Sequence, residues 1–172
     1  MALVINGNGA VTGLTALPSS AMASGSVIQT ITESTNAIIT ISGTTPVELS
    51  TDLRATIVPK NANNIIIITV VLGVVSCSSS NVATLKVLKD GTDIVDAFTN
   101  TVTSSGNGQF WTNAENMTTM TMHVSELAGN TNSRYYSPFG RSSGTNSFLV
   151  NSYRISGSFL SSSRITVTEV SV

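Results

Sequence analysis

The sequence offers few side chains that could act as a nucleophile or a general base. Its single histidine is His123 and its single cysteine is Cys77. Nucleophilic catalysis needs a base beside the nucleophile, and His123 is the only imidazole that could serve. It lies in an alternating segment with Thr121 and Ser125 on the same face, and this alternation explains its position without a catalytic role. Cys77 follows an apolar run, where a lone cysteine is usually a small buried hydrophobe.

Three carboxylates, Asp90, Asp93 and Asp96, lie close together in the sequence. Asp90 belongs to an Asp-Gly turn, and the other two fall on opposite faces of a strand. The ligand spacing of a calcium-binding loop is not met here, and one Cys with one His cannot supply a tetrahedral zinc site. Two distant carboxylates could still meet as a glycosidase pair, so a polysaccharide hydrolase stays open as an alternative. We predict no catalytic residue, no metal site and no cofactor.

Aromatic and cationic side chains concentrate in residues 134–141, which read Arg-Tyr-Tyr-Ser-Pro-Phe-Gly-Arg. Arginine and tyrosine are frequent at the energetic centres of interfaces, and exposed aromatic rings also stack on sugars. Strand periodicity fails over residues 127–147, and Pro138 and Gly140 disfavour a central strand. We therefore expect a loop here. Its predicted contact residues are Tyr135, Tyr136, Phe139 and Arg141, and the alternative is that these aromatic rings cap the open end of the fold.

The composition limits the classes of protein that need to be considered. The chain has 172 residues, 10% of them charged, and a net charge of −1. A nucleic-acid-binding protein needs a surplus of Lys and Arg to displace counterions, so we expect no nucleic-acid partner. Polar surface comes instead from serine, threonine and asparagine, and hydroxyl residues mixed with Val and Ile are typical of β-strands. The length allows one domain with a core plus an arm.

The N-terminal segment, residues 1–25, differs from the rest of the chain because it holds no charged side chain. It carries apolar residues on both sides of an Asn-Gly-Asn-Gly turn, and so short a segment cannot bury them against itself. We predict an extended arm over residues 1–25, ordered by packing on another chain, and a β-domain over residues 26–172; a disordered tail is the alternative. The predicted contact residues of the arm are Leu3, Val4, Ile5, Val11 and Leu14.

The rest of the chain predicts an all-β fold. Apolar alternation or short apolar runs recur about every ten residues, separated by turn residues. The most apolar run, residues 65–75, is too short to span a bilayer as a helix and predicts a mid-sheet strand, and no signal peptide is recognised. We expect a two-sheet antiparallel β-sandwich of the jelly-roll kind, with long loops over residues 100–111 and 127–147. The expected strands are residues 26–32, 37–42, 53–58, 65–75, 82–88, 94–98, 119–125, 148–153, 155–160 and 165–170.

Four segments in order resemble a family of known proteins. They are residues 5–14 (INGNGAVTGL), 25–30 (GSVIQT), 85–92 (LKVLKDGT) and 163–170 (SRITVTEV). Together they resemble the small β-sandwich virion proteins of tailed bacteriophages, especially those of marine cyanobacteria. The resemblance implies a viral structural protein, a homotrimer located in the virion, with no catalytic residue.

Three functions follow from these features. The first is a capsid decoration or head-fibre protein attached through the arm to other virion proteins. The second is a short tail fibre or receptor-binding tip that recognises a host surface glycan, and the third is the hydrolase. Only the short arm precedes the expected sandwich, with no long shaft of the kind that tail fibres have, so we expect the first. We expect no membrane partner.

Overall fold

The computed structural model describes residues 4–5, 11–12, 22–77, 81–93, 109–112, 118–142, 147–152 and 161–172. Nearly all the regular structure in these residues is strand, with one turn of 3₁₀ helix, η2. The elements are β1 (Val4–Ile5), β2 (Val11–Thr12), β3 (Val27–Thr35), β4 (Ile39–Ile41), β5 (Val47–Glu48), η2 (Thr51–Leu53), β6 (Ala55–Ile57), β7 (Ile65–Cys77), β8 (Asn81–Lys89), β9 (Thr92–Asp93), β10 (Gln109–Thr112), β11 (Thr118–Leu127), β12 (Arg134–Ser142), β13 (Phe148–Val150) and β14 (Ser163–Val170).

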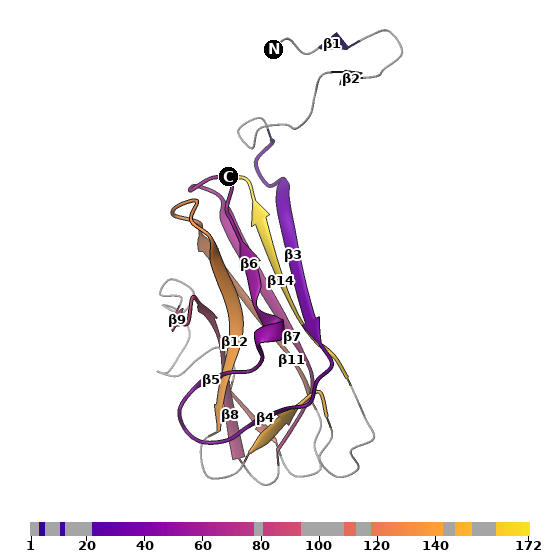
Figure 1. Ribbon diagram of the computed structural model, residues 1–172, viewed down its shortest axis with the longest axis vertical. Coiled ribbons are helices and arrows are strands. Elements are labelled where there is room, and N and C mark those ends of the chain that lie inside the picture. Colours follow the sequence, from indigo (N-terminus) through magenta and orange to yellow (C-terminus); the bar gives the residue numbers. More distant parts are fainter. Residues whose placement is uncertain are drawn as a thin grey trace.

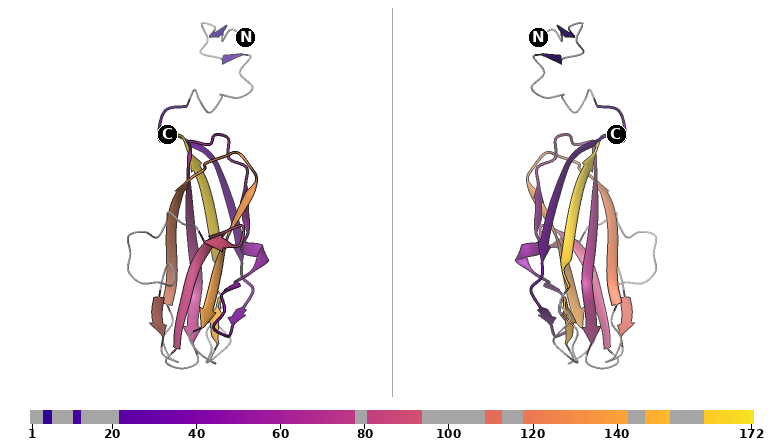
Figure 2. Two further views of the ribbon diagram at one scale, coloured as in Figure 1. Left: turned by 90° about the vertical axis from the view of Figure 1, so that its left-hand side faces the viewer. Right: turned by 90° about the vertical axis from the view of Figure 1, so that its right-hand side faces the viewer.

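Two antiparallel sheets pack face to face and run along the long axis of the molecule (Figures 1 and 2). The first sheet has the order β3-β14-β7-β11, and β13 and β4 extend it beside the far end of β7. The second has β12 and β8 at its centre, β5 and β6 on one side, and β9 and β10 on the other. The all-β sandwich expected from the sequence is confirmed.

The strand pairing has the nested pattern of a jelly roll. The pattern is seen in eight of the described strands, which in chain order are β3, β6, β7, β8, β10, β11, β12 and β14. The first pairs with the eighth, the second with the seventh, the third with the sixth and the fourth with the fifth. The nested pairs correspond to one long antiparallel hairpin that is folded over so that its strands form two sheets.

β7 lies at the centre of the first sheet, paired along both of its edges, and its sequence is apolar on the inner face and largely apolar on the outer one. β11 pairs along one edge, while β14 and then β13 pair along the other. Alternate residues Ile66, Ile68, Val70 and Leu72 are fully buried between the sheets. They pack with Ile165 and Val167 of β14, Leu85 and Val87 of β8, and Phe148 of β13. The expectation of a mid-sheet strand at residues 65–75 is confirmed.

Where the sequence alternates cleanly, the strand faces agree with expectation. Met122 and Val124 of β11 point into the core and Met120 is partly buried, while Thr121 and His123 point outward. β8 ends in a two-residue turn in which Asp90 and Gly91 have φ angles of 50° and 75°. Predicted strands at residues 94–98 and 155–160 lie outside the described residues.

Several short strands lie outside the expected ranges, β10 and β5 among them. β10 occupies the end of the segment expected to be a loop over residues 100–111, and it pairs with β8. β5 contains only Val47 and Glu48, and it pairs with Phe139 and Gly140 of β12. Two residues are too few to produce a periodic pattern, so β5 leaves no signal in the sequence.

The prediction of a loop over residues 127–147 is wrong, because β12 crosses it as a central strand. Gly140 faces the core, where a β-carbon would lie 2.8 Å from Leu85 Cδ2 and 2.9 Å from Phe148 Cζ. The carbonyl of Pro138 accepts a hydrogen bond from the amide of Leu49. In a strand the N–H and C=O of one residue point to the same side. The N–H that proline lacks would therefore face the gap between β5 and β6, and no bond to β8 is lost.

The N-terminal strands stand apart from both large sheets. β1 and β2 form their own antiparallel pair, with Val4 opposite Thr12 and Ile5 opposite Val11. They lie beyond the end of the sandwich that carries the C-terminus (Figures 1 and 2). Among the predicted contact residues of the arm, Leu3 and Leu14 lie outside the described residues.

Candidate functional site

The residues considered as catalysts, where the structure describes them, lie on different elements. His123 is exposed on β11, and its Nδ1 lies 3.0 Å from the hydroxyl of Thr69 on β7. Asp90 occupies the turn after β8, as predicted, and its Oδ1 accepts a hydrogen bond from the amide of Tyr135. Asp93 ends β9, Cys77 ends β7, and Asp96 lies outside the described residues. Within the described part of the chain, no group of three or more His, Cys, Asp or Glu could hold a metal ion.

A buried ionic cluster joins the two sheets. Glu126 of β11 lies 2.8 Å from Lys89 Nζ of β8, and it accepts a hydrogen bond from the hydroxyl of Tyr136 of β12. Arg134 Nη1 is 3.9 Å from the same carboxylate and also donates to the carbonyl of Ala128. Burial and the bond to Glu126 raise the pKa of Tyr136 well above its ordinary value. The phenol therefore stays protonated and serves as a hydrogen-bond donor, not as a base.

A second buried carboxylate, Glu169 of β14, is held by neutral donors. It accepts hydrogen bonds from the side chains of Gln29 and Asn64 and from the backbone amides of Lys60 and Asn61. Burial alone would raise the pKa of Glu169, but these four bonds outweigh it and hold the pKa below its ordinary value. This arrangement ties β3, β14 and the turn before β7 together at the arm end of the sandwich.

The aromatic segment of residues 134–141 is divided between the two faces of β12. Tyr136 is fully buried in the core, so the prediction that it belongs to a contact surface is wrong. Tyr135, Phe139 and Arg141 are half-buried and point away from the core. Successive side chains of a strand point to opposite faces, so Tyr136 faces the core while Tyr135 and Phe139 face outward. The sequence of this segment shows no alternation of apolar and polar residues that would have revealed this.

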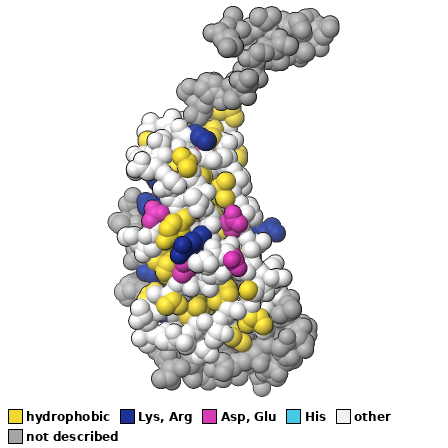
Figure 3. Space-filling model, in the orientation of Figure 1, with side chains coloured by type: hydrophobic (Ala, Val, Ile, Leu, Met, Phe, Trp, Pro, Cys, Tyr) yellow, Lys and Arg dark blue, Asp and Glu magenta, His cyan; other side chains and the backbone are white. Residues whose placement is uncertain are grey.

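The outer face of the second sheet carries a charged and aromatic group. The guanidinium of Arg54 lies over the ring of Tyr135, 4.9 Å from its centroid. It also donates two hydrogen bonds to Glu48, at 2.7 and 2.6 Å, which hold the pKa of Glu48 below its ordinary value. Phe139 is opposite Glu48 in the strand register. Figure 3 shows basic and acidic side chains midway along this face, beside exposed hydrophobic ones.

Sequence reasoning missed Arg54, Glu48 and Glu169. Glu48 lies in β5, which left no periodic signal, and Arg54 reaches it across η2. Glu169 did have a signal, because it continues the inward positions of Ile165 and Val167. A charged residue at an inward position of a strand requires an internal partner.

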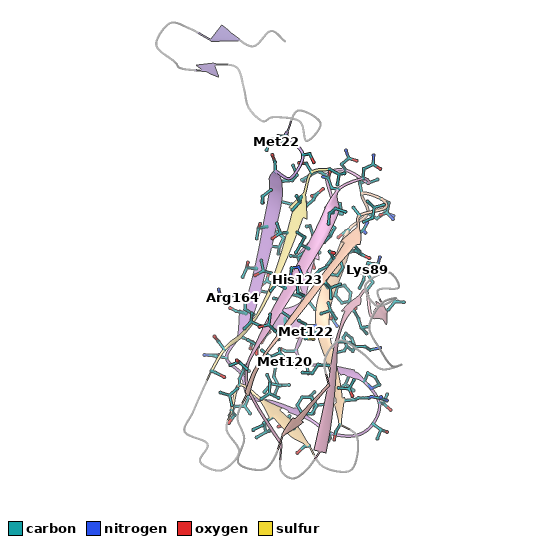
Figure 4. The ribbon with its side chains drawn as sticks, turned by 180° about the vertical axis from the view of Figure 1, so that it is seen from behind. Met22, Lys89, Met120, Met122, His123 and Arg164 are labelled. Atoms are coloured by element: carbon teal, nitrogen blue, oxygen red, sulfur yellow. The ribbon has the colours of Figure 1, made fainter. Side chains whose placement is uncertain are left out.

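The outer face of the first sheet carries many hydroxyl groups. Thr32, Thr166, Thr69 and His123 form one row across β3, β14, β7 and β11. The hydroxyls of Thr32 and Thr166 lie 3.3 Å apart, as do those of Thr30 and Thr168. Figure 4 places His123 and Arg164 midway along the sandwich, away from Met22 at the arm end.

The arm joins the sandwich beside the C-terminus. The amide of Gly25 donates to the carbonyl of Ser171 over 2.8 Å, and the amide of Ser171 donates to the carbonyl of Ser26 over 2.9 Å. The hydroxyl of Ser171 donates to the carbonyl of Ala23 and accepts from the amide of Ser26. These bonds fix residues 23–26 against the residue that follows β14.

A scan against models of protein families finds no match for this sequence, and a search of curated proteins finds none. None of the helices in the described residues is long and apolar enough to cross a membrane. Function must therefore be inferred from the surfaces and side chains of the molecule.

Proposed function

We propose that this protein is a structural component of a bacteriophage particle, attached through its N-terminal arm as a capsid decoration or head-fibre protein. The observation that carries the proposal is the fixed root of the arm at one end of a jelly roll. Residues 1–25 are uncharged and short, so their apolar groups need a partner surface. With its root held by Ser171, such an arm attaches the sandwich by one end and leaves the other end pointing outward.

The buried polar side chains form hydrogen bonds and ion pairs with one another, and this supports a structural role over a catalytic one. Glu126, Lys89 and Tyr136 bond to one another between the sheets, and Glu169 bonds to neutral donors. Each of these groups stabilises the packing of strands. The resemblance of four segments to phage virion proteins, together with strand surfaces that carry little charge, supports a homotrimer located in the virion.

A second candidate function is recognition of a host surface glycan by a tail tip. The outward side chains of Arg54, Tyr135 and Phe139 favour it, because an aromatic ring beside a guanidinium is a common setting for sugar and protein contacts. A screen of the protein against glycans of the host surface tests this candidate. Binding that is lost in Tyr135→Ala and kept in Thr121→Ala, on the opposite sheet, would favour the tail-tip function.

Sedimentation with purified particles tests the first proposal. We expect the full chain to bind, and a triple variant with Leu3, Val4 and Ile5 replaced by serine to lose binding at least tenfold. A control with Asn6 and Asn8 replaced by serine changes only polar arm residues and should bind normally. Retention of binding by the triple variant would show that the arm is not the anchor.

A further inference from the structure

Large aliphatic side chains gather at the arm end of the first sheet, where two are exposed and two are half-buried. Val27, Val170, Ile65 and Leu127 form one row across β3, β14, β7 and β11, which we call the apolar end row. Val27 is 58% exposed and Leu127 is 54% exposed. Val172, which follows β14, is 72% exposed. Because these side chains are neighbours and not scattered singly over the surface, they are a candidate contact site.

The apolar end row is aliphatic on all four strands, whereas the next rows of the same outer face mix aliphatic and polar residues: Ile67 lies between Thr168 and Ser125, and Val71, which is 41% exposed, lies between Arg164 and Thr121. The next rows contain Thr30 and Thr168, then Thr32 and Thr166, whose hydroxyls lie close to one another. The neighbouring carboxylates Glu126 and Glu169 point inward and are occupied by internal donors. A partner suited to this row therefore presents uncharged aliphatic side chains.

The arm of this chain has the chemistry that the row requires. The arm holds no charged side chain, and Val11, the first residue of β2, is one of its aliphatic residues. The stretch from Val11 to Met22 can span up to about 36–40 Å when fully extended, so its length does not confine Val11 to the end of its own sandwich. β1 and β2 lie beyond the end of their own sandwich, where they leave their own apolar end row exposed (Figures 1 and 2).

We infer that the apolar end row binds the Val11 region of the arm of a second copy of this chain. The contact is head-to-tail, since arm and row are different surfaces, and repetition about an axis closes it into a ring. The inference rests on the self-association proposed above. It leaves the outer segment of the arm, Leu3 to Ile5, available for the particle.

Disulfide trapping in solution, without particles, tests the inference. In a Cys77→Ser background, proteins carrying Val11→Cys or Leu127→Cys alone are mixed and oxidised at micromolar concentration. We expect a covalent heterodimer on a non-reducing gel. The double variant should give covalent oligomers up to the ring. Because Leu127 is exposed, its replacement should leave the fold intact, and circular dichroism checks this.

The matched control places the second cysteine at Thr121, which is exposed on the same face of β11 as Leu127. At the rise of an extended strand the two positions are about 20 Å apart. Val11→Cys should link to the control position at least tenfold less. A link confined within one chain, or equal linking at both positions, would overturn the inference.

The mass of the oligomer gives a second readout. Replacing both Val27 and Leu127 by serine removes the most exposed side chains of the apolar end row and should lower the mass measured by light scattering. An unchanged mass would also overturn the inference. Because particles are absent from these experiments, such failures are distinct from a failure of particle attachment.

Discussion

The side-chain amide of Asn64 donates a hydrogen bond to Oε1 of Glu169 over 2.6 Å and joins the turn before β7 to the end of β14. With Gln29 and two backbone amides, it surrounds a buried carboxylate with neutral donors. The shape of the arm end therefore depends on the ionised form of one side chain.

Glu169→Gln should destabilise the fold by about 1–3 kcal/mol at neutral pH, because the new amide group faces donors and not acceptors. The folded pKa of Glu169 lies below its ordinary value of 4.5. Its stabilisation is therefore present above that pH and is lost as the pH falls through the folded pKa. Urea unfolding of both proteins measures the difference.

The exposed Glu33 of β3 gives the control for this prediction. Glu33→Gln should change the free energy of unfolding by less than about 0.5 kcal/mol. A gap between wild type and Glu169→Gln that stays constant from about pH 6 to about pH 3 would contradict the assignment.

Tyr136 and Phe139 provide a matched pair on opposite faces of β12. Tyr136→Ala should cost about 3–5 kcal/mol because it empties a fully buried site. In Tyr136→Phe, Glu126 loses a hydrogen-bond donor, and the cost should be about 1–3 kcal/mol. Phe139→Ala should cost less than Tyr136→Ala because its ring is half-buried. Thermal or urea unfolding measures all three, and equal losses for the two alanine variants would refute the assignment of faces.

Gly140→Ala should destabilise the protein by about 1–3 kcal/mol through overpacking of the core. The added β-carbon would lie 2.8 Å from Leu85 Cδ2. Leu85→Val combined with Gly140→Ala should recover part of the loss, as a double-mutant cycle would measure. Additive losses in the double variant would show that the two side chains do not meet.

Self-association is expected to give a homotrimer. Light scattering of the full chain at micromolar concentration should report a mass of about three chains. A monomer at every concentration would contradict both the trimer and the proposed contact between the arm of one chain and the apolar end row of another.

Sequence patterns predicted the strands whose two faces differ. In β11 the core side holds Met122 and Val124 and the water side holds Thr121 and His123, so alternation is visible. β12 was missed because apolar side chains occupy both of its faces: Tyr136 and Pro138 lie on the inner face, and the half-buried Tyr135 and Phe139 lie on the outer one. A strand with apolar residues on both faces shows no alternation of apolar and polar residues.

The site residues were harder to predict because their partners are distant in the chain. Glu169 bonds to Asn64 and Gln29, which lie 105 and 140 residues away. Local propensity carries no information on such pairs, and the nested strand order that brings them together is itself non-local. Two-residue strands such as β5 are also too short to be recognised.

Averaged electron cryomicroscopy images of the intact phage particle test the central claim most directly. We predict density for the jelly roll on the outside of the head, with Ser171 and the arm root facing the particle and the opposite end of the sandwich facing outward. Density at the tail tip, attachment by the opposite end, or no density for this chain on the particle would contradict the proposed function.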